Sequence, residues 1–413
     1  VRSLGIPCYE SIEKLQDCDF FIDGLFGFGL ERDIKEPIAS AINLLNQWNK
    51  LIFSIDIPSG LHTDTGKVLG IGVRATHTLC LGLWKLGLLE DQALEYIGKA
   101  ELINFDIQYI DVQAVLGEYP KIQRITTTTA LSHLPLPRQQ VTHKYKEGHL
   151  LLICGSRRYS GGAILTGLGA RASGVGMLSI VVPQSLTATM VSHLPEALII
   201  GCPETQNGAI AQLQLPDNKD LNNFDAIACG PGITLDASAI LPEILNSSKS
   251  LLLDADGLNI LASMGTLPTL QKRQAPTILT PHLGEFKRLF PNIKNANQNR
   301  VLAVLEAAKQ SGAIILFKGS RTAIANPQGY VWINPQSTPA LARGGSGDVL
   351  TGLLGGLMAQ AISQNLSVEQ MVTTAAWWHA QAGMLAVRER TELGVDAFTL
   401  TGYLMPALTS ITR

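Results

Sequence analysis

Charged residues are scarce in this chain, and neither sign forms a block. Only 16% of its 413 residues are Asp, Glu, Lys or Arg, and the formal net charge is −2. A nucleic-acid-binding protein needs a basic patch to neutralise phosphates. Long apolar runs are missing too, because Gly, Pro or a charged residue breaks each run well before the roughly 20 residues that a membrane span needs. We therefore expect neither a nucleic-acid partner nor a membrane partner.

Cysteine is sparse and follows no pattern. The six cysteines stand at positions 8, 18, 80, 154, 202 and 229, with no C-x-x-C spacing. This indicates buried thiols in a reducing compartment. No signal peptide is present, so we expect a cytoplasmic protein. The chain starts at Val1, and we expect this start to fall partway through a domain. No G-x-G-x-x-G motif follows the first strand of either predicted domain, which disfavours a bare dinucleotide-binding module.

Apolar residues are plentiful and are arranged as strands that alternate with helices. They make up 46% of the chain, enough for large cores, and the length predicts two domains, at 1–115 and 120–413. In the first, stretches near 20–23, 51–57, 76–81 and 100–107 predict a parallel sheet with both faces covered. Residues 112–140 have weak periodicity and predict a connector followed by the entry to the second domain.

Polar side chains follow two of the N-terminal strands. Asp23 follows the first strand, and Asp56 and Ser59 follow the second. Ligands of parallel α/β sheets bind beyond the carboxyl ends of the strands. Two carboxylates and a hydroxyl there can bind a cation, or hold a ribose or an amide. The alternative is that the two Asp residues only cap loops beside turns.

Six further apolar stretches in the second half each end in Gly, Asp, His or Lys. They predict a doubly wound α/β sheet with polar groups along one edge. Lys318, with its KGSRT turn, suits a nucleotide's phosphates or its adenosine. His282 can hold a phosphate or an amide, or be satisfied at its turn. Asp254 and Asp256 can support Mg²⁺ through water, or cap the next helix.

The last polar loop has the sequence ARGGSGD and leads into a helical apolar pattern. Small residues let several N–H groups converge on one anion at a helix N-terminus. Asp348 would then be placed as a general base or acid beside that anion. The alternative is that Asp348 only stabilises its own helix.

The N-terminal motifs FIDGLFGFGLERD, SIDIPSGLHTDTG and LGLWKLGL resemble the second half of the YjeF N-terminal domain, the NAD(P)H-hydrate epimerase. The resemblance implies a part of a Rossmann-like three-layer α/β/α domain, with potassium bound by Asp23 and Ser59. It implies substrate contacts by Asp56 and by the loop Gly27, Phe28, Gly29, Leu30, Glu31, Arg32 and Asp33. The family's upstream Asn-Asn-Gly-Gly-Asp loop has no counterpart here. Either another chain supplies it, or this half is a non-catalytic module.

The C-terminal motifs resemble the YjeF C-terminal domain of the ribokinase-like superfamily, the ADP-dependent (S)-NAD(P)H-hydrate dehydratase. They are HKYKEGH, GSRRYSGGAILTG, ACGPGI, LDADGLNIL, TPHLGEF, KGSRTAI and GGSGDVLTGLLGGLMAQ. The resemblance implies that Asp348 is catalytic and that the hydrate contacts Gly162, Gly232, His282 and Asp348. It implies that ADP, or ATP, is held with Mg²⁺ by Lys318, Gly319, Ser320, Arg321, Thr322 and Gly347.

The resemblance also implies the substrates NADH hydrate and NADPH hydrate, and a homo-oligomer, a tetramer or larger. Arg157, Arg158 and Arg343 are candidates for contacting a 2′-phosphate; the alternative is that all three are plain surface charges. The main rival function is a ribokinase-like small-molecule kinase with a non-catalytic N-terminal module. Such kinases share the GxGD-type loop, but they do not combine it with HKYKEG, TPHLGEF and KGSRT.

Overall fold

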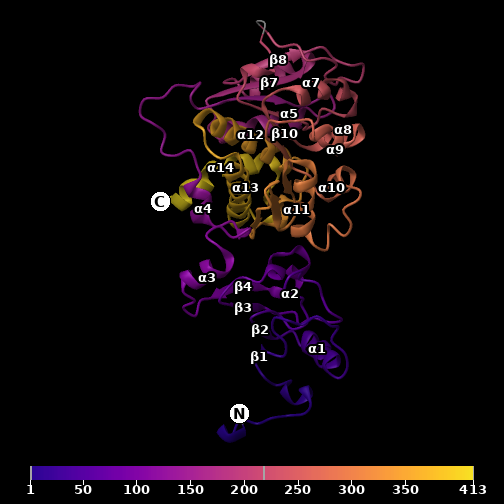
Figure 1. Ribbon diagram of the computed structural model, residues 1–413, viewed down its shortest axis with the longest axis vertical. Coiled ribbons are helices and arrows are strands. Elements are labelled where there is room, and N and C mark those ends of the chain that lie inside the picture. The colour runs from indigo at the N-terminus through magenta and orange to yellow at the C-terminus, as the bar shows by residue number, and fades with distance from the viewer. Residues whose placement is uncertain (1, 217–218, 413) are drawn as a thin grey trace. The chain divides into compact units, whose positions relative to one another are not determined.

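The computed structural model describes residues 2–216 and 219–412. The chain divides into two compact units, each with its own sheet (Figure 1). One unit runs to Pro120 and also takes in Asn297–Asn299, and the other holds Lys121–Ala296 and resumes at Arg300. Residues 1 and 413, the outer bounds of the two predicted domains, lie outside the described residues. None of the helices within the described ranges has the length and apolarity needed to cross a membrane.

The N-terminal unit is built on a four-stranded parallel sheet. Its order is β1 (Phe20–Asp23), β2 (Leu51–Ile55), β3 (His77–Leu81) and β4 (Lys99–Ile103). Helix α1 (Ile38–Gln47) packs Ile42 and Leu45 against Phe21 of β1 and Ile52 of β2. The short helices α2 (Leu94–Ile97) and α3 (Tyr109–Leu116) follow. The predicted parallel α/β arrangement is confirmed.

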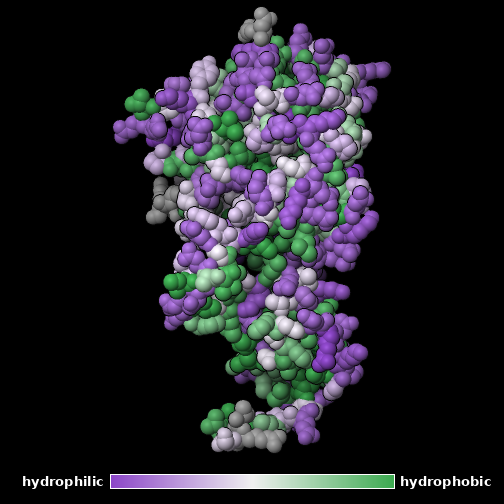
Figure 2. Space-filling view, in the orientation of Figure 1, coloured by the Kyte–Doolittle hydropathy of each residue, from purple (hydrophilic) through white to green (hydrophobic). Residues whose placement is uncertain are grey.

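The prediction that both faces of this sheet are covered is wrong for the described residues. In β1, Phe21 and Asp23 are buried, whereas Phe20 and Ile22 on the other face are 55% and 67% exposed. The strands follow one another in chain order, and right-handed crossovers in one direction place every connecting segment on the same face. Figure 2 shows hydrophobic residues over much of the visible surface of this unit.

The C-terminal unit contains a ten-stranded sheet in the order β5-β14-β13-β12-β11-β10-β9-β6-β7-β8. The six predicted strands are confirmed as β6 (His149–Ile153), β7 (Met177–Pro183), β9 (Ala226–Cys229), β10 (Ser250–Leu253), β11 (Thr277–Leu279) and β12 (Ile314–Phe317). The sequence analysis did not identify β5 (Ile122–Arg124), β8 (Leu198–Cys202), β13 (Thr322–Ala325) or β14 (Val331–Asn334). Strand β13 is antiparallel to both of its neighbours, so the KGSRT motif spans the turn from β12 into β13.

Part of the predicted connector belongs to the second unit. Strand β5 pairs in parallel with β14. Helix α4 (Thr127–Ser132) begins with a capping box in which the Thr126 and Thr129 side chains each bond the other's backbone N–H. Elements of three and six residues are too short to show a hydrophobic period, so the sequence did not reveal them.

Helices cover both faces of the large sheet, which confirms the doubly wound fold. One hydrophobic cluster joins alternate strand residues, such as Leu150 and Leu152, to α4, α5 (Ser160–Ala172), α6 (Thr187–His193), α12 (Ser346–Gln364), α13 (Val368–Arg390) and α14 (Ala397–Thr412). Leu151 and Ile153 point to the opposite face and are also fully buried. That face carries α7 (Leu241–Asn246), α8 (Ala255–Met264), α9 (Thr266–Leu270), α10 (Leu283–Leu289) and α11 (Arg300–Ser311).

Helices α5 and α12 approach each other so closely that their contact positions need glycine. A Cβ on Gly352 would lie 1.8 Å from the Thr166 carbonyl oxygen, and one on Gly169 would lie 2.2 Å from the Val349 carbonyl oxygen. Any larger residue would push the helices apart. The glycines thus fix the start of α12 relative to the start of α5.

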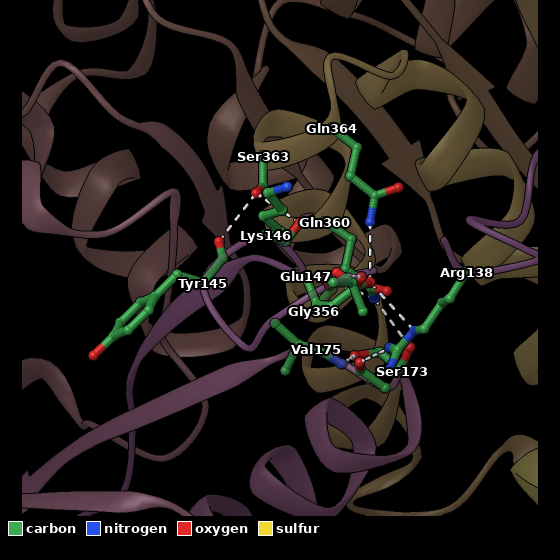
Figure 3. Close-up of polar contacts among 12 residues, drawn as sticks. Arg138, Tyr145, Lys146, Glu147, Ser173, Val175, Gly356, Gln360, Ser363 and Gln364 are labelled. Atoms are coloured by element: carbon green, nitrogen blue, oxygen red, sulfur yellow. Dashed lines mark hydrogen bonds and ion pairs between the residues drawn. The ribbon is translucent and has the colours of Figure 1, made fainter. Parts of the chain in front are cut away.

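The HKYKEGH motif holds the far ends of the same two helices (Figure 3). The buried Glu147 carboxylate accepts a hydrogen bond from Gln364 Nε2 at 3.2 Å and pairs with Arg138 Nε at 3.2 Å. Gln360 Nε2 donates to the Ser173 carbonyl oxygen at 3.0 Å. The motif therefore has a structural role: it anchors the C-terminal end of α12.

The expectation of buried thiols is confirmed for four cysteines and wrong for two. Cys80, Cys154, Cys202 and Cys229 are buried, Cys8 and Cys18 are exposed, and all six are free thiols. The exposed pair lies before β1, outside the sheet core.

Candidate functional site

The site lies where the strand order of the large sheet reverses. From β6 the chain continues to β7 and β8 on one side, while β9 to β12 extend on the other side. At this point the Gly155 N–H donates to the Pro231 carbonyl oxygen at 2.8 Å. The loops beyond β6 and β9 leave in opposite directions at such a switch point, which makes it the usual place for a ligand.

Three of the predicted site residues meet at this switch point. A Cβ on Gly162 would lie 3.3 Å from Asp348 Oδ2 and 3.9 Å from the Gly232 nitrogen. Gly162 stands in the first turn of α5 and Asp348 in the first turn of α12. The close approach of these two helices therefore brings the carboxylate to the glycine.

Asp348 is a carboxyl group that titrates near neutrality. Its pKa is raised to about 7, mainly by burial; Asp254 and Asp256 add to the rise, and Lys318 opposes it. A carboxyl with a pKa near the working pH can accept and return a proton efficiently. Such a group at a strand-end crevice is a candidate for acid–base catalysis.

Lys318 forms an ion pair with Asp254, and this pair lies beside the first turns of α12. Its Nζ lies 2.7 Å from Asp254 Oδ1, and Thr351 Oγ1 donates to Asp254 Oδ2 at 2.7 Å. A Cβ on Gly347 would lie 3.3 Å from the same Nζ. Burial by itself would lower the pKa of Lys318, but Asp254, Glu285 and Asp348 outweigh burial and raise it. The site thus keeps a charged ammonium beside the GGSGD loop.

The other KGSRT residues follow Lys318 in the turn from β12 into the start of β13. The Lys318 N–H donates to the Pro281 carbonyl oxygen at 2.9 Å, and Thr322 Oγ1 donates to the Gly319 carbonyl oxygen at 3.3 Å. Gly319 and Ser320 are exposed, while Arg321 is half-buried. Their contact with a nucleotide remains a prediction.

His282 caps helix α10, and its Nε2 lies beside the Glu285 carboxylate. Its Nδ1 accepts from the N–H groups of Gly284 at 2.9 Å and Glu285 at 3.4 Å, and the Glu285 carboxylate accepts from the His282 N–H at 2.8 Å. Burial, with Lys318 and Arg288 adding to it, lowers the pKa of His282, so the ring is neutral at pH 7. Because Nδ1 accepts, the proton is on Nε2. Nε2 lies 3.4 Å from Glu285 Oε1, and 57% of the histidine side chain is exposed, so this N–H has a carboxylate neighbour and is also reachable from solvent.

Asp254 and Asp256 do not form a metal site by themselves. Asp254 is engaged by Lys318 and Thr351 rather than by the backbone of α8, although it stands at the N-cap position. Asp256 Oδ2 accepts from the Thr234 N–H at 3.0 Å. Within the described ranges there is no cluster of three or more His, Cys, Asp or Glu suited to a metal ion. Mg²⁺ commonly uses one or two carboxylates together with phosphates and water, so these residues fit it only with a bound nucleotide.

His379 is a buried residue of α13 that was not among the site residues predicted from the sequence. Its Nε2 donates to the Ser346 carbonyl oxygen at 2.9 Å. Burial lowers its pKa to about 4, which keeps the ring neutral. A polar side chain in an otherwise apolar stretch of α13 was the available signal. Thr351 was not predicted either, because its partner Asp254 is 97 residues away.

Asp23 and Ser59 lie together in the N-terminal unit. Asp23 Oδ1 accepts from Ser59 Oγ at 2.6 Å, and Asp23 Oδ2 accepts from Ser54 Oγ at 2.7 Å and from the Ser59 N–H at 2.9 Å. Both residues are buried. Their oxygens, with the Phe26 carbonyl oxygen 3.2 Å from Ser59 Oγ, are the ligand type that hard cations prefer.

Asp56 lies near the predicted substrate loop, residues 27–33, and its neighbour in that loop is Gly27. A Cβ on Gly27 would lie 3.9 Å from Asp56 Oδ2. Asp56 has a φ of +70°, forms an ion pair with Lys85, and accepts from the Leu81 N–H at 3.2 Å. The rest of the loop is exposed or half-buried, with Phe28 76% exposed.

Comparison with known proteins shows that two parts of the chain match two known families. Residues 150–405 match the family described as NAD(P)H-hydrate dehydratase, and residues 2–87 match the family described as YjeF-related protein N-terminus. A bifunctional NAD(P)H-hydrate repair enzyme from Synechocystis is 50% identical over 98% of this chain and 76% of its own length. The enzyme of that name from Thermosynechococcus vestitus is 49% identical over 98% and 78%.

Solved structures resemble the C-terminal part. An ADP/ATP-dependent NAD(P)H-hydrate dehydratase from Bacillus subtilis, co-crystallised with ATP and Mg²⁺, is 30% identical with a TM-score of 0.60, covering 71% of this chain and 100% of that one. A ribokinase-like protein from Enterococcus faecalis, at 21% identity and a TM-score of 0.59 over 71% and 97%, supports the fold alone.

Proposed function

Since the chain belongs to the YjeF-related family of bifunctional NAD(P)H-hydrate repair enzymes, we propose that its C-terminal unit dehydrates (S)-NADH hydrate and (S)-NADPH hydrate at the expense of ADP. The observation that carries this proposal is the meeting of Asp348 with Gly162 at the strand switch point, next to the ammonium of Lys318. The products are NADH or NADPH, AMP and phosphate.

The reaction begins as a phosphoryl transfer. The terminal phosphate of ADP lies against Lys318 and the N–H groups of the GGSGD loop, which stabilise developing charge. The hydroxyl on C6 of the hydrated nicotinamide faces Asp348, which takes its proton as the oxygen attacks phosphorus, and AMP leaves. When bound, Mg²⁺ would neutralise charge on the phosphates, and Asp254 and Asp256 are the residues that would hold it.

Elimination completes the repair. The C6–O bond breaks, phosphate leaves with the bonding electrons, and the lone pair of the ring nitrogen compensates the charge on C6. Loss of a proton from C5 then restores the dihydronicotinamide ring. His282 Nε2–H, Gly162 and Gly232 hold the hydrate, while Gly319 to Thr322 and Gly347 hold the nucleotide. The Bacillus relative's description as ADP/ATP-dependent supports either nucleotide, and we propose ADP.

The test follows the absorbance band of reduced nicotinamide after the chain and Mg-ADP are added to mixed (R)- and (S)-NADH hydrate. Recovery that stops when the (S) form is consumed supports the dehydratase and indicates an inactive N-terminal unit. Recovery of both epimers supports an active epimerase as well. No recovery, with a phosphorylated small alcohol accumulating instead, would establish the small-molecule kinase.

We propose that the N-terminal unit epimerises (R)- and (S)-NAD(P)H hydrate when the family's Asn-Asn-Gly-Gly-Asp loop is supplied to it, with K⁺ held by Asp23 and Ser59. Asp56 and the loop Gly27–Asp33 contact its substrate. Replacing K⁺ by the larger tetramethylammonium should remove epimerisation and leave dehydration of the (S) form unchanged. Epimerisation that persists without K⁺ would contradict the cation site.

We further propose a cytoplasmic homo-oligomer, a tetramer or larger. Light scattering on the purified chain measures the oligomer's mass. The six free thiols support a cytoplasmic location. The location of a fluorescent fusion protein in the cell tests it.

A further inference from the structure

We propose that Arg158 binds a phosphate group of the dinucleotide hydrate, with its guanidinium held on the ring of Tyr159. This inference rests on the proposed dehydratase function and adds a substrate-recognition element to its site. The phosphate is either the pyrophosphate common to both hydrates or the 2′-phosphate of NADPH hydrate.

A continuous series of contacts leads from the reacting carboxylate to this pair. Asp348 lies against Gly162, whose Cβ position is 3.9 Å from the Gly232 nitrogen. A Cβ on Gly232 would in turn lie 2.9 Å from Tyr159 Cβ and 3.0 Å from the Tyr159 carbonyl oxygen. Tyr159 is 46% exposed and Arg158 is exposed. Both therefore stand at the open margin of the site, where the remainder of a bound dinucleotide must extend.

Arg158 differs from the two other candidate arginines in its partners. Arg157 Nη2 pairs with Glu204 Oε2 at 2.6 Å, and Arg343 Nη2 donates to the Leu393 carbonyl oxygen at 3.0 Å. Among the described residues, Arg158 has neither a carboxylate nor a carbonyl partner; its guanidinium carbon lies 5.3 Å from the centre of the Tyr159 ring. A stacked guanidinium keeps its N–H edges free for bidentate binding of phosphate.

The surroundings of Arg158 favour an anion. Glu204 pairs with Arg157 at 2.6 Å, and within the described residues no acidic side chain pairs with Arg158. Helix α5 has 13 residues, no acidic residue in its first turn and no side-chain cap from Tyr159, so its N-terminal partial positive charge adds to the arginine's. The aromatic ring also offers a face to a nucleotide base or the nicotinamide ring.

The test compares kcat/KM for (S)-NADH hydrate and (S)-NADPH hydrate at saturating Mg-ADP. Arg158→Gln should lower it by about tenfold to a hundredfold, the range of a lost charged hydrogen bond, mainly through KM. A loss confined to NADPH hydrate identifies the 2′-phosphate, and an equal loss for both identifies the pyrophosphate. Values within twofold of the unchanged protein for both substrates would overturn the proposal.

Matched variants separate recognition from folding. Arg171→Gln removes an exposed arginine from the other end of α5, where it pairs with Glu196 at 3.6 Å, and should change nothing. Tyr159→Leu removes the ring that holds the Arg158 guanidinium and should raise KM as Arg158→Gln does. Calorimetric binding of NADH and NADPH to each variant needs no turnover. A binding loss in Arg158→Gln therefore supports this inference even if the dehydratase function fails.

Discussion

Lys318 and Asp254 form an ion pair, 2.7 Å between Nζ and Oδ1, in which 22% of the lysine side chain and 2% of the aspartate side chain are exposed. The pair joins the KGSRT turn to the strand-end loop of β10, and Thr351 links it to α12. One buried carboxylate thus connects the predicted nucleotide turn to the helix that carries Asp348.

Asp254→Asn should destabilise the C-terminal unit by about 3 kcal/mol, because it leaves a largely buried ammonium without its partner. It should also lower the pKa of Asp348, since Asp254 is one of the groups that raise it. Thermal melting and the pH profile of kcat/KM measure the two effects. Thr351→Val removes a hydrogen bond but keeps the charge, so it should leave the profile in place. An unmoved profile in Asp254→Asn would contradict the electrostatic coupling.

The pH dependence of turnover should show an acidic limb near pH 7. Asp348 acts as a base only when ionised, and its pKa is about 7. Activity should therefore rise through that pH rather than near pH 4.

Asp348→Asn should abolish turnover while ADP still binds, as measured by calorimetry. Retained turnover in that variant would exclude the assigned role.

Asp348→Asn should stabilise the folded protein above neutral pH. The pKa of Asp348 is raised in the folded state from 3.8 to about 7, so its contribution to stability is complete below pH 4 and is lost as the pH rises through 7. At pH 8 the difference is on the order of 4 kcal/mol at most. Melting temperatures of both proteins at pH 8 and below pH 4 test this. An equal difference at both pH values would point to a packing effect instead.

Gly352→Ala should destabilise the protein by more than about 3 kcal/mol and reduce kcat, because the new Cβ would lie 1.8 Å from the Thr166 carbonyl oxygen. The helices must separate, which moves Asp348 away from Gly162. Gly402→Ala is the matched control: this glycine lies in α14, and its Cβ would have no neighbour within 4 Å. It should stabilise the helix by about 0.5–1 kcal/mol. Similar melting temperatures for the two variants would refute the close approach of the helices.

The sequence by itself determined the six-stranded parallel core of the C-terminal sheet and the residue types at its edge. Runs such as Leu150–Ile153 are apolar throughout because both faces of the strand are buried, and this signal is local. The same holds for the helical pattern after Asp348. Residue types in fixed order along the chain were enough to identify the family resemblance, which the comparisons confirmed.

Only the tertiary structure decided which of these groups act on one another. It paired Asp254 with Lys318 and Thr351 instead of with its own helix, and it gave His379 the Ser346 carbonyl as a partner. It left one face of the N-terminal sheet open. Among the three candidate arginines it gave Arg157 a carboxylate partner and Arg343 a carbonyl partner, and within the described ranges it placed Arg158 over the ring of Tyr159. Apart from the contact of Arg158 with its neighbour Tyr159, each of these outcomes depends on contacts between residues distant in the chain. Hydrophobic periodicity and motif spacing report only local neighbours, so no reading of the sequence alone could supply them.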